Sequence, residues 1–223
     1  MTYYKELLQA TEKERNALLA TPVITDCMRG MITLDTYQAF LVEAYHHVRY
    51  TVPLLMACGS RLPRRLEWLR EAVGEYIEEE TGHQEWILND IDASGGDKEA
   101  VRGGKPTMAT DIMVAYAWDS VQRRNPVGFF GMVLVLEGTS VRLATEAAGI
   151  IQKKLELPNK AFSYLSSHGS LDIEHIAFYE KLINQLEEPD DREAVLRTAR
   201  VIYSLYAGVF NSLPRSMNQQ QAA

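Results

Sequence analysis

Residues 127–137 read VGFFGMVLVLE, the most apolar run of the chain, which ends at a single acidic residue, Glu137. The run is about half as long as the ~20 apolar residues that a membrane-spanning helix needs. A helix that is apolar on every side is typical of the centre of a helical domain. We therefore predict a core helix here. Its carboxylate needs a positive partner, because burying an unpaired carboxylate costs several kcal/mol.

The rest of the chain divides into long helical segments. Proline and glycine separate them, and no window shows the alternation with β-branched residues that predicts a strand. The predicted helices cover residues 3–20, 33–57 with a kink at Pro53, 63–92, 107–124, 127–157, 160–186 and 188–213, and residues 93–106 form the one long loop. Short connections favour neighbouring antiparallel helices around one core. We predict an all-α domain over residues 1–213 and a disordered tail over residues 214–223.

Composition excludes several classes of protein. The 223 residues are 46% hydrophobic and 24% charged, which is typical of a folded globular chain. A net charge of −7 without a basic tract argues against a nucleic-acid partner. The two cysteines, Cys27 and Cys58, lack CxxC spacing, and the polar start of the chain has no apolar signal region. We expect a cytoplasmic protein with no membrane or nucleic-acid partner.

The strongest chemical pattern is His168-x3-Asp172-x2-His175 in the predicted helix 160–186. At about 100° per residue, positions i, i+4 and i+7 lie on one face of a helix. Two imidazoles and a carboxylate on one face are competent to bind a metal. Taken alone, they can also be polar groups that satisfy one another in a core.

Carboxylates on three other predicted helices complete a possible site. Glu79 and Glu80 precede His83 by four and three residues, and Glu80-Thr-Gly-His83 has the Glu-x-x-His spacing of di-iron bundle proteins. Glu43 precedes His46 with the same spacing, and Glu137 lies in the core helix. Each feature also has a structural interpretation: a Glu-x-x-His pair can be exposed, and Glu137 can pair with an arginine.

The features carry more weight together. All five histidines lie on the predicted helices of this cluster: His46, His47, His83, His168 and His175. Nitrogen and oxygen ligands without a thiolate favour iron or manganese over structural zinc. The sequence therefore predicts a dinuclear metal site with these proposed ligands: Glu43, Glu79 or Glu80, His83, Glu137, His168, Asp172 and His175. Tyr45 and Tyr179 are candidate catalytic residues close to it.

These motifs together resemble the haem-oxygenase-like di-metal oxidases, relatives of the TenA and PqqC proteins that are also called iron-containing redox enzymes. The resemblance covers essentially the whole chain. It implies a bundle of about seven or eight helices that binds two iron ions, or iron and manganese. It also implies dioxygen as co-substrate and oxidation or cleavage of a small organic acid or amine. Some members have a carboxylate seven residues before the histidine, where this chain has Tyr76, so Glu79 or Glu80 must serve.

Other activities of the same fold match less well. Haem oxygenase binds haem through a histidine near the N-terminus, and this chain has none before His46. TenA-type hydrolases use a cysteine on a mid-chain helix, and residues 107–157 contain none. A metal-independent PqqC-like or TenA-like protein that binds a small molecule remains the alternative. A ferritin-like iron store is disfavoured by the additional His168 and the extra helices. We expect a homodimer, because such helical folds often pair.

Overall fold

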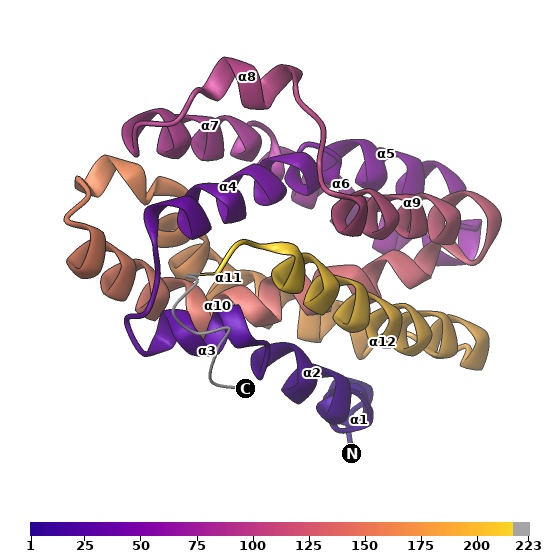
Figure 1. Ribbon diagram of the computed structural model, residues 1–223. Coiled ribbons are helices and arrows are strands. Elements are labelled where there is room, and N and C mark those ends of the chain that lie inside the picture. Colours follow the sequence, from indigo (N-terminus) through magenta and orange to yellow (C-terminus); the bar gives the residue numbers. More distant parts are fainter. Residues whose placement is uncertain (216–223) are drawn as a thin grey trace.

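The computed structural model describes residues 1–215, with the backbone but not the side chains of residues 168–174. The described chain is helical and contains no strand, as predicted (Figure 1). Its α-helices are α1 (Tyr3–Ala10), α2 (Glu12–Leu19), α3 (Pro22–Met28), α4 (Leu34–Val48), α5 (Thr51–Arg61), α6 (Glu67–Glu80), α7 (His83–Ala93), α8 (Lys98–Gly103), α9 (Met108–Arg123), α10 (Phe129–Leu155), α11 (Ser163–Ile183) and α12 (Pro189–Ser212). Three short 3₁₀ helices are η1 (Arg64–Leu66), η2 (Pro126–Gly128) and η3 (Asn159–Ala161).

The described residues form more helices than the seven or eight expected, because several predicted helices are divided. The predicted helix 3–20 breaks at Thr11, between α1 and α2. The predicted helix 33–57 breaks between α4 and α5, before Pro53. The proline causes no kink there, because it lies in the first turn of α5, where its missing N–H costs no helical hydrogen bond.

Two segments without a predicted helix are also helical. α3 begins at Pro22, a favourable first residue because its φ angle is already suited to a helix. α8 lies inside the predicted loop 93–106, where the Asp97 side chain accepts hydrogen bonds from the N–H groups of Glu99 and Ala100. The tail begins on the body of the protein, because the Pro214 carbonyl accepts a hydrogen bond from Thr36. Residues 216–223 lie outside the described residues.

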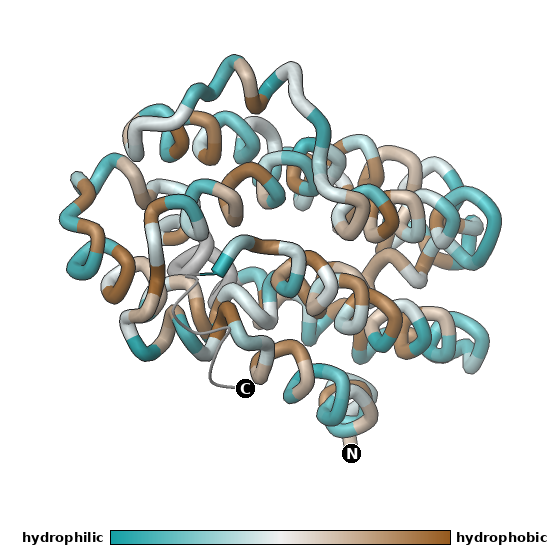
Figure 2. Tube along the Cα trace, viewed as in Figure 1, coloured by the Kyte–Doolittle hydropathy of each residue, from teal (hydrophilic) through white to brown (hydrophobic). Residues whose placement is uncertain are grey.

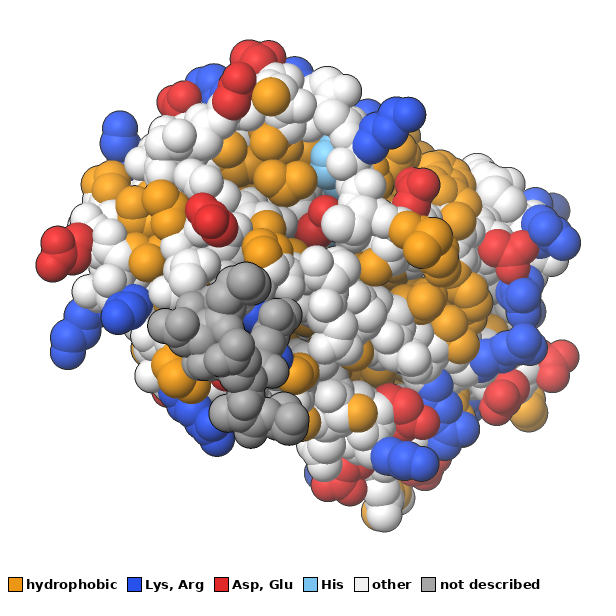
Figure 3. Space-filling view, viewed as in Figure 1, with side chains coloured by type: hydrophobic (Ala, Val, Ile, Leu, Met, Phe, Trp, Pro, Cys, Tyr) orange, Lys and Arg blue, Asp and Glu red, His pale blue; other side chains and the backbone are white. Residues whose placement is uncertain are grey.

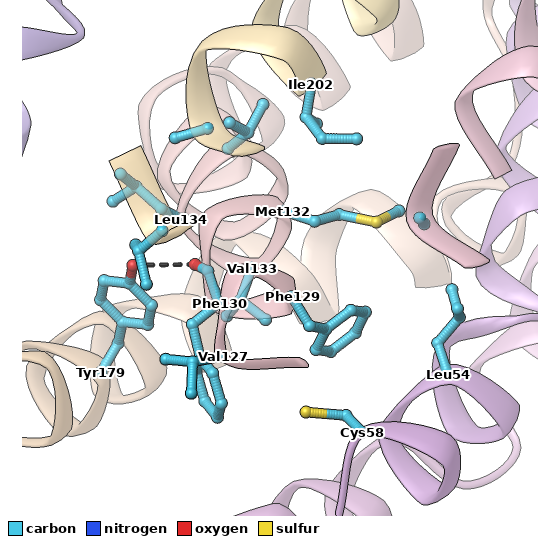
Figure 4. Close-up of a cluster of buried hydrophobic side chains, with 14 of the residues drawn as sticks. Leu54, Cys58, Val127, Phe129, Phe130, Met132, Val133, Leu134, Tyr179 and Ile202 are labelled. Carbon is cyan, nitrogen blue, oxygen red and sulfur yellow. Dashed lines mark hydrogen bonds between the residues drawn. The ribbon is translucent and has the colours of Figure 1, made fainter. Parts of the chain in front are cut away.

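Helix α10 is the centre of the fold, as the apolar run predicts. It packs most extensively against α11 and α12 (Figure 1). Phe129 and Met132 lie on the side of α10 that faces α5, whereas Leu134 lies on the side of Tyr179 (Figure 4). Two sides of α10 therefore face different parts of the protein.

In the part of the chain that the structure describes, one helical stretch, Pro126–Leu155, is long and apolar enough to cross a membrane. Other parts of the protein bury 61% of its most apolar window. This burial is what a core helix requires. Along the other helices hydrophobic and hydrophilic residues alternate (Figure 2), as expected where each helix buries one face.

Charged and hydrophobic side chains are also separated on the outer surface. On the face shown in Figure 3, most charged side chains lie around the edge, and hydrophobic side chains are exposed in the region of α9. Two hydrophobic residues of α9, Met108 and Ile112, are exposed.

One buried carboxylate fixes the position of α11 relative to α7. Asp90 of α7 accepts hydrogen bonds from the N–H groups of Ser163 and Tyr164, both at 2.9 Å, and from the Ser163 hydroxyl. Burial raises the pKa of Asp90, and these hydrogen bonds oppose that rise. A carboxylate at the first turn of a helix also interacts favourably with the helix dipole. The contact anchors the helix that carries His175.

We expect Gly131→Ala to destabilise the protein by about 3 kcal/mol, because it forces apart two closely packed helices. A Cβ at Gly131 would lie 2.6 Å from the Ala199 nitrogen and 2.9 Å from the Thr198 Cβ, both on α12. The measurement is urea unfolding of the metal-free protein. Gly149→Ala, on the same helix with no atom within 4 Å of the added Cβ, is the matched control. It should be neutral or stabilising by up to about 1 kcal/mol. Equal effects of the two substitutions would contradict the close packing.

Candidate metal centre

Three helices bring Glu80, Glu137 and His175 together. Each offers one ligand atom, and these atoms lie within 4.8 Å of one another. Glu80 is the last residue of α6, whereas Glu137 and His175 lie within α10 and α11. Their side chains are only 10%, 12% and 8% exposed. Two poorly hydrated carboxylates beside an imidazole suit a divalent cation, which offsets their charge, so this donor set fits the predicted metal.

His83 lies beside this group because the helix is interrupted between Glu80 and His83. The sequence predicts Glu80 and His83 on one helix, but α6 ends at Glu80 and α7 begins at His83. Gly82 makes the turn with φ of +96°, a conformation that favours glycine. The turn places Nδ1 of His83 3.1 Å from Oε2 of Glu80. The predicted pair is therefore brought together by a turn.

Trp86 is a further part of this site that sequence reasoning missed. Its indole stacks on the His83 ring, with 4.0 Å between centroids and 29° between planes. This stacking restricts the orientation of the imidazole. The available signal was an aromatic residue three positions after a candidate ligand, at a spacing that places both on one helix face.

The two candidate glutamates of α6 have different positions. Glu80 belongs to the group of three, whereas Glu79 is 51% exposed, with its Oε2 3.1 Å from Nε2 of His175. Oε1 of Glu137 lies 3.9 Å from Nδ1 of the same imidazole. His175 thus lies between carboxylates from two helices. Both glutamates approach the centre, with Glu80 in the more buried position.

Glu43 is directed to α9. Its two carboxylate oxygens accept hydrogen bonds from the Thr107 N–H, at 3.1 and 3.2 Å, and one also accepts from the Thr107 hydroxyl at 2.9 Å. Thr107 is the residue that precedes the first turn of α9. In this structure the predicted ligand therefore holds the start of a helix, and it lies outside the group of three.

The side chains of His168 and Asp172 lie outside the described residues. The backbone of α11 is one helix from Ser163 to Ile183, as the His-x3-Asp-x2-His pattern requires. The prediction that both residues are ligands stands as a prediction.

The two candidate catalytic tyrosines are buried. Tyr179 donates a hydrogen bond to the Phe130 carbonyl at 2.8 Å (Figure 4), and burial raises the pKa of its hydroxyl well above the usual value. Tyr45 packs edge-to-face on His46, and the Arg49 guanidinium lies 5.7 Å from its ring centroid. A third phenol, Tyr76, packs edge-to-face on His175 with 6.2 Å between centroids. Tyr76 therefore lies against the cluster, although it is not one of the two candidates predicted from the sequence.

The adjacent histidines of α4 differ in environment. Nδ1 of His47 lies 2.8 Å from the Glu43 carbonyl, and its ring packs edge-to-face on Tyr206. Burial lowers the pKa of His46, which keeps that imidazole neutral near pH 7. His47 lines the cavity described next.

A cavity of about 160 Å³ adjoins the candidate centre, with Glu80 and Glu137 in its wall. Most of the other lining residues are apolar and come from α3, α4, α5, α10 and α12. Ser140, three residues after Glu137, also lines it, and its hydroxyl is buried with no hydrogen-bond partner among the described residues. The cavity is thus apolar along most of its length, with carboxylates and a hydroxyl on α10 and α6.

Cys27 of α3 also lines this cavity. Burial raises the pKa of its thiol to about 11. Only a thiolate is an effective nucleophile, so a thiol with this pKa is a poor one near neutral pH. The geometry does not favour covalent catalysis by a cysteine.

Comparisons with known proteins agree with this architecture. The family model for iron-containing redox enzymes matches residues 38–207. The chain is similar to a crystallised domain of unknown function with a heme oxygenase-like fold from Shewanella denitrificans, with a TM-score of 0.82, 22% identity, and 95% of this chain and 91% of that chain covered. A TenA homologue from Pseudomonas syringae gives a TM-score of 0.78 at 11% identity, with 95% and 91% covered. Heme oxygenase from Leptospira interrogans gives 0.76 at 16% identity, with 96% and 100% covered. No curated protein matches the sequence.

We expect Glu43→Gln to lower the stability of the metal-free protein by about 1–2 kcal/mol, because it weakens charge-assisted hydrogen bonds to Thr107. Thr107→Val, which removes only the hydroxyl, should give a smaller loss. Thermal and urea unfolding without metal provide the measurement, and Glu146→Gln on the exposed surface of α10 is the control. An unchanged stability combined with lost metal binding would show that Glu43 acts as a ligand and not as a helix anchor.

Proposed function

The chain belongs to the iron-containing redox enzyme family, and we propose that it is a non-haem dinuclear iron or iron/manganese oxidase. Its reaction would use dioxygen to oxidise or cleave a small organic acid or amine. The observation that carries the proposal is the convergence of Glu80, Glu137 and His175 in the wall of an apolar cavity. When bound, the metal supplies the redox chemistry and the activation of dioxygen that amino-acid side chains lack.

The proposed ligands come from four helices. Glu80 and His83 flank the turn between α6 and α7, Glu137 lies on α10 and His175 on α11. Two carboxylates and two imidazoles are a suitable set for iron or manganese, and Trp86 fixes the ring of His83. We assign the remaining ligands to His168, Asp172 and Glu79.

The cavity supports a substrate with an apolar body and a polar head. Its apolar wall offers no hydrogen bonds to a fully polar molecule, and desolvating such a molecule is costly. Ser140 is one helical turn from Glu137, so its buried hydroxyl is placed to donate a hydrogen bond to a carboxylate head near the centre. The walls exclude water from the body of the substrate and orient its head toward Glu80 and Glu137.

A metal-independent protein that binds a small molecule is the second candidate. The cavity favours it, because an apolar ligand needs only this enclosed space. Metal content and dioxygen uptake distinguish the two candidates.

Anaerobic loading with Fe(II) should give about two ions per chain in the wild type and fewer than about one in Glu137→Gln, because the substitution removes a charged ligand. Metal is measured by plasma emission spectrometry after desalting. Glu146→Gln, on the same helix but exposed, is the matched control and should load like the wild type. Equal loading of all three proteins, with less than about one ion each, would support the metal-independent candidate.

Ala144→Phe should abolish substrate-dependent dioxygen uptake while leaving metal content unchanged. Ala144 is buried in the cavity wall, seven residues after Glu137 on α10, so the added ring fills space that the substrate needs. Uptake by the Fe(II)-loaded protein is followed with an oxygen electrode, using hexanoate, hexylamine and aspartate as probes. Ala100→Phe, on exposed α8, controls for the added ring. A preference for aspartate over hexanoate and hexylamine would contradict the assignment of an apolar body.

A further inference from the structure

We propose that a second, smaller pocket binds a small organic carboxylate. This pocket has a volume of about 110 Å³ and is lined by residues of α1, α2, α10, α11 and α12. It lies on another side of α10 from the large cavity, because Leu134 and Gly138 line it while Val133 and Glu137 line the cavity. Figure 4 shows the same division, with Leu134 on the side of Tyr179 and Met132 directed toward Leu54. The proposal does not depend on the function proposed above.

Two guanidinium groups, Arg15 and Arg142, line the pocket. Among the described residues neither lies within 4.0 Å of a carboxylate oxygen, although most of the ion pairs of this protein join an arginine to an acid. Arg15 donates from Nη1 to the Leu8 carbonyl at 3.0 Å. Its Nε is buried, with no acceptor in the part of the chain that the structure describes. A buried charged donor without an acceptor is costly, and an anionic ligand beside the guanidinium would offset its charge.

Two phenols face the same space. Tyr203 lines the pocket, and both Arg15 and Arg142 act electrostatically on its hydroxyl. The Tyr4 hydroxyl is influenced by both arginines and by one acid, Glu180. Burial raises the pKa of both phenols, so they are neutral hydrogen-bond donors. Glu180 offsets part of the positive charge, which leaves the pocket with an excess of about one positive charge over the described groups.

The side chains that line the pocket favour a carboxylate over inorganic phosphate. Leu8, Leu134 and Ile176 line the pocket beside the arginines. A guanidinium binds a carboxylate through two parallel hydrogen bonds, and it binds phosphate in the same way. The apolar walls favour a ligand that has an apolar body as well as a charged head, and inorganic phosphate has none. The volume suits a short aliphatic carboxylate of about the size of butyrate.

The pocket and the candidate metal centre share two helices, α10 and α11. Gly138 follows Glu137 on α10, and Ile176 follows His175 on α11. A ligand here contacts the N-terminal helices α1 and α2 as well as both of these helices. Binding would therefore stabilise the folded protein in proportion to ligand concentration and affinity.

The test is butyrate binding to the metal-free full-length chain, measured by ligand-observed NMR titration and by thermal shift. We expect Arg142→Ala to raise the Kd for butyrate about 10-fold or more, because it removes charge-assisted hydrogen bonds. Arg142 is exposed, so its removal should leave the fold intact. Tyr203→Phe, which keeps the buried ring, should raise the Kd by a smaller factor. Arg123→Ala, another exposed arginine, should bind like the wild type.

Two comparisons decide where the ligand binds and what it is. Ala144→Phe obstructs the large cavity, so butyrate affinity should survive this substitution. Affinity lost in Ala144→Phe but kept in Arg142→Ala would place butyrate in the large cavity and overturn the proposal. Inorganic phosphate should bind at least about 10-fold more weakly than butyrate. Equal affinities, or no butyrate binding at millimolar concentration, would also overturn it.

Discussion

A carboxylate within an apolar helix is stable only where hydrogen bonds or positive charge compensate for its lost hydration. Glu137 imposes this constraint on the fold, because α10 is the central helix and the Glu137 side chain is only 12% exposed. Imidazole from α11 meets this constraint on one side, and the end of α6 approaches with a second carboxylate. Two acids beside one imidazole are a donor set that could hold a metal ion. The helix at the centre of the core thus also carries one of the residues of the candidate metal centre.

The fold class was predictable because it depends on composition and on the spacing of apolar residues, and both can be read directly from the sequence. The apolar run in α10 and the long amphipathic segments indicated an all-α domain, and the heme oxygenase-like fold is confirmed. The number of helices was not predictable in the same way. The breaks at Thr11 and between α4 and α5 occur within segments of good helical pattern, because tertiary packing decides where a long segment turns. The proline at position 53 gave a misleading signal, since it begins a helix well and interrupts one only in its interior.

The candidate site was predictable in its residue types and less so in its contacts. Glu80, Glu137 and His175 converge as spacing and burial indicated. Glu43 was the exception: its spacing from His46 is that of a ligand pair, but its oxygens are bound to Thr107, sixty-four residues away. A contact with that sequence separation leaves no local pattern. The pocket that contains Arg15 and Arg142 likewise has no local sequence pattern, because its residues come from five helices.

The left-handed turn at Gly82 distinguishes this candidate centre from one in which both proposed ligands lie on a single straight helix. In a continuous helix, two ligands three residues apart have a fixed separation that the helical pitch sets. Here Glu80 ends α6 and His83 begins α7, with two residues between them, so the turn at Gly82 and the packing of α7 set the distance between the two side chains. Asp90 and Trp86 lie on α7 together with His83, so the contact of Asp90 with the start of α11 helps to fix the position of His83. The position of His83 therefore depends on how α7 packs against α11, whereas that of Glu137 depends on the core helix α10.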